Sequence, residues 1–364
     1  MSDSDSEIQI RFKLSTKAVG LLGLSFVLSV TLGVLVWVSF RAPDETLAEH
    51  RHGWSADAFQ AEETAQIVGA MPAFQIVGEN GEVIVQDNAK SNVRLWEAVV
   101  AVNGQNLPNV PQQVGDCVSW AYAHGCELLI AIEMKSEGGK EFHRIFPPYI
   151  YGTSRVLIGN GKLKGDGSCM AWACRAGQQY GILRSDADGV PGYSGSLARD
   201  WGRNGPPKQL LEAAKMFTVG TVSPIRSAAE CRDALANGYP CPFGASQIGW
   251  ENTVIKHGRI VGIRSGQWSH AQVAVGYDGS GPEPLFCILN SWGPRAGGKS
   301  PMQGEPDGSY WISERDMDFV ARQGDCFAIS GFAGFKARKI DFKLTERVNP
   351  IDRKGQSKTF AKGV

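Results

Sequence analysis

The hydrophobic pattern of the chain begins with an apolar run of 23 residues that carries no charge. It extends from Ala18 to Phe40, and a helix of this length, at ~1.5 Å per residue, spans a hydrocarbon core of roughly 30 Å. A cleaved signal peptide usually has a shorter apolar stretch and small residues at its cleavage site, which Phe40-Arg41-Ala42-Pro43 does not provide. The pattern predicts an uncleaved transmembrane anchor over residues 18–40.

Basic residues flank this predicted anchor unequally. Three of them lie in residues 1–17 and two soon after the span, at Arg41 and Arg51. This bias favours a single-pass topology with the N-terminus inside and the rest of the protein outside the cytoplasm. Small residues also recur every four positions within the span, which predicts either weak helix pairing or plain contact with lipid; they are Ser25, Ser29 and Gly33.

Mixed, charged sequence follows the anchor over residues 41–91. A helix is predicted at 57–67, and Asn80-Gly81 between two apolar stretches is typical of a β-hairpin turn. The segment is interpreted either as a spacer or as an inhibitory prosegment. At the other end, residues 336–364 are basic and poor in large apolar side chains, so we expect a polar tail.

Between these segments, residues 92–335 carry the pattern of a folded domain. Cys117 to Met134 is rich in Ala, Leu, Ile and Glu and predicts a helix, with Asp116 as its N-cap. An apolar strand is predicted to begin at His270, and a buried strand at 285–289. Forty-four glycines also favour a substantial β component.

The composition of the whole chain excludes several classes of protein. Hydrophobic residues make up 43% of the sequence, so the chain is not disordered as a whole. Basic and acidic residues number 37 each, which gives no indication of nucleic-acid binding. The eight cysteines form no CxxC pair, and we expect neither a metal site nor an organic cofactor.

Three separated segments carry candidate chemistry. Cys117 at a helix start lies where backbone N–H groups and the helix dipole favour the thiolate, the form that attacks a carbonyl carbon. His270 at the mouth of a strand can exchange a proton with such a sulfur. The amide of Asn290, at the end of the next strand, can accept the imidazole N–H, and Trp292 can shield that bond.

Together these segments resemble the papain-type cysteine peptidases. A cysteine at a helix start, followed far downstream by a histidine and an asparagine, is the chain order of that family. Asn290-Ser291-Trp292-Gly293 is identical to its asparagine motif, and Ser269-His270-Ala271 is similar to its histidine strand. The sequence Gly165-Asp166-Gly167-Ser168 resembles the glycine-rich wall of its cleft. The resemblance covers about residues 92–333.

The resemblance implies an α+β, two-lobe fold behind the anchor. A helical lobe would cover about residues 100–215 and a β-barrel-like lobe about 216–335. Cys117 would be the nucleophile, His270 its base and then acid, and Asn290 the group that orients the imidazole. Gly167 and Ser168 would pair with an extended peptide substrate, as an added strand does.

This chain departs from the family pattern at several positions. Val118 stands where the family has tryptophan, and Pro111 where it has the glutamine that donates to the oxyanion. Gln112 and Gln113 are the alternatives for that donor, and Gln112 is preferred because a one-residue deletion would place it. Val114 replaces a cysteine, so the usual disulfide at that point is absent. The helix motif of eukaryotic prosegments is not visible in residues 41–91.

Three functions are compatible with these residues. The first is a membrane-anchored cysteine endopeptidase that acts on extended protein segments. The second is a related acyl-transfer enzyme or a hydrolase of cell-wall peptides, since a thioester does not dictate its acceptor. The third is a binding module without catalysis that retains the cleft. If Cys117 stays free, seven cysteines remain; Cys231 and Cys241 could form a disulfide, but the sequence leaves the connectivity open.

Overall fold

The computed structural model describes residues 52–138, 141–250, 252–256, 258–294 and 304–340. Contacts divide the chain into Met1–Ala48 and Glu49–Val364. The predicted anchor at 18–40 and most of the predicted tail lie outside the described residues. Within the described ranges, no helix combines the length and apolarity that crossing a bilayer requires.

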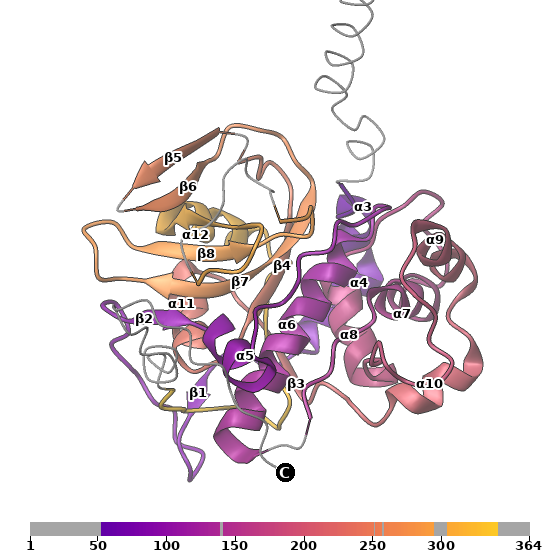
Figure 1. The fold of residues 1–364 in the computed structure, drawn as a ribbon, viewed down its shortest axis with the longest axis horizontal. Coiled ribbons are helices and arrows are strands. Elements are labelled where there is room, and N and C mark those ends of the chain that lie inside the picture. The colour runs from indigo at the N-terminus through magenta and orange to yellow at the C-terminus, as the bar shows by residue number, and fades with distance from the viewer. Residues whose placement is uncertain (1–51, 139–140, 251, 257, 295–303, 341–364) are drawn as a thin grey trace, which may run out of the picture. The chain divides into compact units, whose positions relative to one another are not determined.

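The described residues form a mixed fold of helices and strands in which α6 (Cys117–Glu133) is central. Figure 1 shows this helix between the sheet and the remaining large helices. Nearly all of its side chains are buried, as expected for a helix that is apolar on every side. The prediction of a helix over 117–134 is therefore confirmed, and the chain continues in a π-helical turn, η1 (Met134–Gly138).

Helices pack on one side of α6. In chain order they are α7 (Pro147–Gly152), η2 (Thr153–Ile158), α8 (Met170–Tyr180), α9 (Gly195–Asn204) and α10 (Lys208–Ala214). They follow one another along the chain without an intervening strand (Figure 1), and α7, α9 and α10 contribute to a buried cluster that includes Tyr149 and Trp201.

A seven-stranded sheet lies on the other side of α6. The strand order is β2-β7-β8-β9-β6-β5, and β4 pairs with the first half of β7 while β2 pairs with its last residues. The strands are β2 (Asn92–Arg94), β4 (Cys241–Ala245), β5 (Asn252–Lys256), β6 (Arg259–Ile263), β7 (His270–Asp278), β8 (Leu285–Leu289) and β9 (Ser309–Ser313). Every residue of β7 and β8 is buried, which explains the uninterrupted apolar sequence of β8 and the apolar run Val273–Val275 in β7.

Smaller elements complete this side of the molecule. A two-stranded antiparallel sheet joins β3 to β10, and the helices α11 and α12 pack against the strands. Their bounds are β3 (Thr221–Pro224), α11 (Ala228–Ala236), α12 (Glu314–Arg322) and β10 (Phe327–Ser330). All eight cysteines are buried free thiols, and those of Cys231 and Cys241 interact directly with each other.

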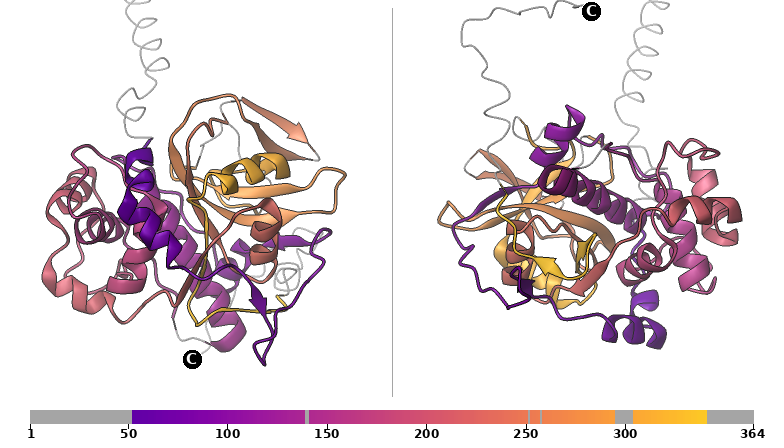
Figure 2. Two further views of the ribbon diagram at one scale, coloured as in Figure 1. Left: turned by 180° about the vertical axis from the view of Figure 1, so that it is seen from behind. Right: turned by 90° about the horizontal axis from the view of Figure 1, so that it is seen from below.

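The segment before residue 92 is packed into this fold. The single helix predicted over 57–67 is wrong, because the extended backbone of Ala61 separates α3 (Ala56–Gln60) from α4 (Glu62–Gly69). The break lets the hydroxyl of Thr64 donate to the Ala58 carbonyl, 2.6 Å away, and accept the indole N–H of Trp172 in α8 at 2.7 Å. Figure 2 shows the two short helices against the helical side of the molecule.

The chain then turns through Asn80-Gly81, where the hairpin was expected. Gly81 has the positive φ of 84° that this turn needs, and Val77 forms a bridge with Val83. The strand β1 (Ile76–Val77) also pairs in parallel with β11 (Phe335–Lys336), near the end of the described chain. The predicted hairpin is thus confirmed, because the Ile84 N–H donates to the Ile76 carbonyl and the Gly78 N–H to the Glu82 carbonyl, both at 2.8 Å. The second pairing of β1, with β11, was not predicted.

Candidate active site

The candidate nucleophile, Cys117, is the first residue of α6 and is fully buried. Its sulfur interacts with the backbone N–H of Ala271, the residue after His270. Burial raises the pKa of the thiol to about 12, and the nearby carboxyl group of Asp116 acts in the same direction. The N–H groups at the helix start lower this pKa, as expected, but desolvation outweighs them, so the thiol is neutral in this arrangement.

His270 begins β7, and its imidazole is held from two directions. Its Nε2 lies 2.8 Å from Oδ1 of Asn290, which follows β8, and the ring of Trp292 stacks on the imidazole with centroids 4.4 Å apart. Among the described residues, its Nδ1 has no hydrogen-bond partner although it is buried. Burial lowers the pKa of His270 to about 3, so the imidazole is neutral. With the N–H on Nε2 directed at Asn290, Nδ1 presents the lone pair that accepts a proton.

Asn109, a residue without a recognisable sequence motif, holds the loop that carries Asn290 in place through hydrogen bonds. The side-chain amide of Asn109 donates to the Asn290 carbonyl at 2.7 Å and to the Asp307 carbonyl at 2.9 Å. Its oxygen accepts the backbone N–H of Gly293 at 2.9 Å. A buried asparagine that ties three chain segments together fixes the position of the imidazole's partner. No local motif marks it, because all its partners are distant in sequence.

The two glutamines before Cys117 have different surroundings. Gln112 is buried: its Oε1 accepts the hydroxyl of Ser291 at 2.7 Å, and its Nε2 donates to the Val114 carbonyl at 3.0 Å. Gln113 is turned toward α9, where its Oε1 accepts the backbone N–H of Gly195 at 2.8 Å. Gln112 therefore lies next to the loop of Asn290, and Gln113 does not.

Asp116 occupies the N-cap position of α6, but its side chain makes no capping hydrogen bond. The predicted cap is thus correct in place and wrong in contact. The carboxyl group is fully buried and accepts the hydroxyl of Tyr193 at 3.1 Å, and that hydroxyl accepts the backbone N–H of Gln113 at 2.8 Å. Burial raises the pKa of Asp116 to about 8. Tyr193 thereby holds the loop before the cysteine in place, a role for which its sequence neighbourhood carries no signal.

Gly167 and Ser168 are not open to solvent, because residues of the same chain pair with them. The Ser168 N–H donates to the Gly53 carbonyl at 2.8 Å, and the Ser55 N–H donates to the Ser168 carbonyl at 2.9 Å, in a parallel bridge. Gly53 lies so close to the carbonyl of Gly115 that a Cβ on it would be 2.1 Å from that oxygen. We call His52–Ser55 the covering strand, because it lies against both the predicted peptide-binding wall and the loop before Cys117.

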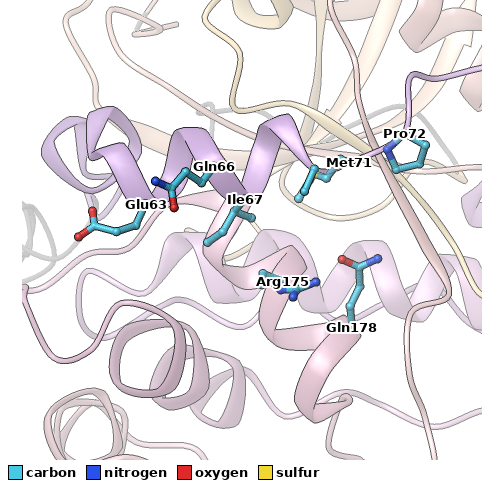
Figure 3. Close-up of a pocket in the computed structure, with 8 residues that line it drawn as sticks. Glu63, Gln66, Ile67, Met71, Pro72, Arg175 and Gln178 are labelled. Atoms are coloured by element: carbon cyan, nitrogen blue, oxygen red, sulfur yellow. The ribbon is translucent and has the colours of Figure 1, made fainter.

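A separate hollow lies between α4 and α8 (Figure 3). It has a volume of about 390 Å³ and is lined by side chains that include Glu63, Ile67, Met71, Arg175 and Gln178. It contains none of the predicted site residues. Over the described ranges, no group of three or more potential metal ligands gathers at this or any other place.

Comparison with known proteins gives structural similarities at low sequence identity. No protein-family model matches the chain, and no curated protein matches it either. Xylellain, a cysteine protease from Xylella fastidiosa, is 15% identical with a TM-score of 0.48, and the match covers 78% of this chain and 96% of that one. Digestive procathepsin L 3 of Tenebrio molitor is 14% identical with a TM-score of 0.49, and the match covers 80% of each chain. Procathepsin B S9 from Trypanosoma congolense is 13% identical with a TM-score of 0.48, and the match covers 79% of this chain and 88% of that one.

Proposed function

We propose that this chain is a cysteine endopeptidase with a papain-like two-lobe fold, anchored in a membrane by residues 18–40. Because the structural similarities are low, the proposal rests on the residues of this chain. The observation that carries it is the imidazole of His270. Its Nε2 is bound to Oδ1 of Asn290 at 2.8 Å, Trp292 stacks on it, and its buried Nδ1 has no partner among the described residues.

In the proposed reaction, His270 Nδ1 takes the proton of the Cys117 thiol as the sulfur attacks the carbonyl carbon of a peptide bond. Asn290 holds the imidazole in the tautomer that makes this transfer possible and stabilises the imidazolium that results. Burial keeps both the thiol and the imidazole neutral in the structure. Removing water from both groups raises the cost of charging them, so a substrate must stabilise the charged pair as it binds.

The negative charge on the carbonyl oxygen needs donors as the tetrahedral intermediate forms. The backbone N–H of Cys117, at the start of α6, is one donor, and Nε2 of Gln112 is the proposed second. The imidazolium of His270 then protonates the departing amine, and the acyl group remains on the sulfur as a thioester. Water, deprotonated by His270, attacks the thioester and restores the thiol.

We also propose that the covering strand keeps the enzyme latent, which favours the prosegment interpretation of residues 41–91 over a simple spacer. Two backbone hydrogen bonds hold the strand on Ser168, where a peptide substrate would pair. Gly53 lies against Gly115, two residues before the nucleophile. A substrate that needs the same backbone groups must displace the strand.

The decisive experiment is covalent labelling with an irreversible thiol-reactive peptide inhibitor, followed by mass spectrometry. It uses the full chain in detergent, with the original sequence and with Trp54→Ala to loosen the covering strand. We expect labelling at Cys117 only, none in Cys117→Ser and a large decrease in His270→Ala. Cys126→Ser is the matched control, because Cys126 is a buried thiol of the same helix and its loss leaves labelling unchanged.

A folded Trp54→Ala protein that is never labelled at Cys117 would refute the proposed peptidase. Product analysis separates hydrolysis from acyl transfer, since transfer to an added amine would yield a new amide instead of a free carboxylate. The anchor is tested separately: the full chain should stay with membranes after alkaline washing, and a chain without residues 1–40 should be released.

A further inference from the structure

The covering strand acts as a ligand that the chain supplies to its own groove. Its backbone pairs with Ser168 through the carbonyl of Gly53 and the N–H of Ser55. Trp54 lies between these two residues, and its indole is directed into the protein, with only 7% of the residue exposed. The space that the indole fills is therefore the space offered to a side chain of any peptide that pairs with Ser168 at this position.

The side wall of this space depends on the absence of a side chain. A Cβ on Gly244, in β4, would lie 2.1 Å from Cδ1 of Trp54 and 2.5 Å from its Nε1. Even alanine at this position would collide with the indole. The sheet itself holds Gly244 in place, because its N–H donates to the Asp325 carbonyl at 2.8 Å and β4 pairs with β7. The wall is therefore part of the rigid framework.

The floor of the space is a fully buried carboxylate. Oδ2 of Asp325 accepts the indole N–H of Trp54 at 2.6 Å. The same carboxylate accepts the backbone N–H groups of Met170 at 2.7 Å and Ala171 at 2.8 Å, at the start of the eleven-residue helix α8. Because these two bonds do not involve the covering strand, the acceptor stays in position when the strand leaves. Burial raises the pKa of Asp325 to about 7, and the N–H donors oppose this rise.

We propose, on the basis of the peptidase function above, that the Trp54 site is the main specificity pocket of the groove and selects a large substrate side chain that ends in an N–H donor. Tryptophan fits it directly, and arginine offers both length and donors. Phenylalanine and leucine can fill the volume, but they have no N–H group. With either of them bound, the buried Asp325 carboxylate would lack the hydrogen bond that the Trp54 indole now donates. A site built to hydrogen-bond a substrate group discriminates strongly against an analogue that lacks it.

The pocket is formed by Gly244 of β4 and by Asp325, two residues before β10, and not by the covering strand. The covering strand pairs in parallel with Ser168. The proposed pocket does not depend on this direction, so it is also open to a peptide that runs the other way. Any chain that lays a side chain between Gly244 and Asp325 meets the same wall and the same floor. The alternative is that Trp54 only anchors the covering strand and that peptides in the groove place no side chain there.

The test compares peptide inhibitors that carry one thiol-reactive group and differ at a single residue, which is tryptophan, arginine, phenylalanine or leucine. Each residue next to the reactive group is varied in turn. The protein is the full-length Trp54→Ala variant, whose pocket is vacated, and the readout is the second-order rate of labelling at Cys117. At one position we expect tryptophan and arginine to exceed phenylalanine and leucine by roughly tenfold or more.

Two further variants in this background connect the preference to the pocket. Gly244→Ala, whose new Cβ would occupy the indole's place, should abolish the advantage of tryptophan over leucine. Asp325→Asn keeps an acceptor oxygen but removes the charge, and it should reduce labelling by the arginine reagent more than by the tryptophan reagent. Thermal unfolding verifies that each variant is folded, and the Trp54→Ala series is informative even where a variant is not.

The outcomes separate the two proposals. A small haloacetamide, which has no side chain to place, reports on the nucleophile alone. If neither this reagent nor any peptide labels Cys117, the proposed function is overturned and the pocket with it. If labelling occurs but the four residues are equivalent at every position, or if Gly244→Ala leaves their order unchanged, the specificity pocket is overturned while the peptidase stands.

Discussion

Replacing Trp54 by alanine should activate the enzyme, since the indole is the main side-chain anchor of the covering strand. It is almost fully buried, and its N–H donates to Asp325 at 2.6 Å. Truncating a buried tryptophan to alanine costs about 3–5 kcal/mol. Because the uncovered state already exposes this side chain, the loss shifts the equilibrium toward the uncovered state. At about 1.4 kcal/mol per tenfold, this shift corresponds to roughly 10²- to 4 × 10³-fold more uncovered protein.

The assay is the rate of labelling at Cys117 by a peptide inhibitor at low concentration. The rate should rise by up to that factor and level off once the uncovered form dominates. Trp54→Phe retains the ring but loses the donor, and a rise of about tenfold is expected. Trp250→Ala is the matched control, because Trp250 is also buried but packs on Tyr310 and Gly262 in the sheet. An equal rise in this control would mean that general unfolding exposes the thiol, and an unchanged rate in folded Trp54→Ala would refute latency by the covering strand.

Three further predictions concern the groups around the nucleophile. Gln112→Ala should lower kcat about 10²- to 10³-fold, the usual cost of losing an oxyanion donor. Gln113→Ala, which loses only a contact with α9, should change kcat little. Equal effects of the two variants in steady-state kinetics would argue against Gln112 as the donor. Asn290→Ala should lower kcat by more than about tenfold, through loss of the bond that orients the imidazole, with a smaller change in KM; a loss confined to KM would contradict that role. The raised pKa of Asp116, about 8 in the folded state against 3.8 ordinarily, means that the folded protein holds an extra proton between about pH 4 and 8. The free energy of unfolding should therefore fall as the pH rises through that window. Asp116→Asn, which still accepts from Tyr193, should make this fall smaller when stability is measured by urea unfolding at each pH. If the variant shows the same pH dependence as the original protein, the carboxyl is already ionised in the folded state.

The residues proposed for the chemistry could be found in the sequence because each lies in a short, recognisable stretch. Asn290-Ser291-Trp292-Gly293 and the strand from His270 are contiguous patterns. In the structure the side-chain oxygen of Asn290 lies within hydrogen-bond distance of the His270 imidazole, as these patterns predict. The helix from Cys117 could equally be predicted, since its seventeen residues contain no proline and are rich in Ala, Leu and Ile, which outweigh the single Gly125.

The groups that surround this chemistry could not be found in the same way. Trp54 and Asp325 are 271 residues apart, and only the folded chain brings the indole N–H to the carboxylate. Asn109 is one of many polar residues in a loop until its three partners are known. The pKa of Cys117 was misjudged for a related reason: the helix start is a local feature, whereas the burial that dominates comes from distant segments.

The way in which residues 52–94 are built into the fold decides how this protein can be shortened for study. Beginning the chain at residue 92 would delete the partner of β11 and uncover the indole of Trp172, which now donates to Thr64. A version without the predicted anchor should therefore start before His52, so that residues 52–94 are retained. Such a preparation would be isolated with its groove already filled, and low activity on first assay would be the expected behaviour of an intact protein.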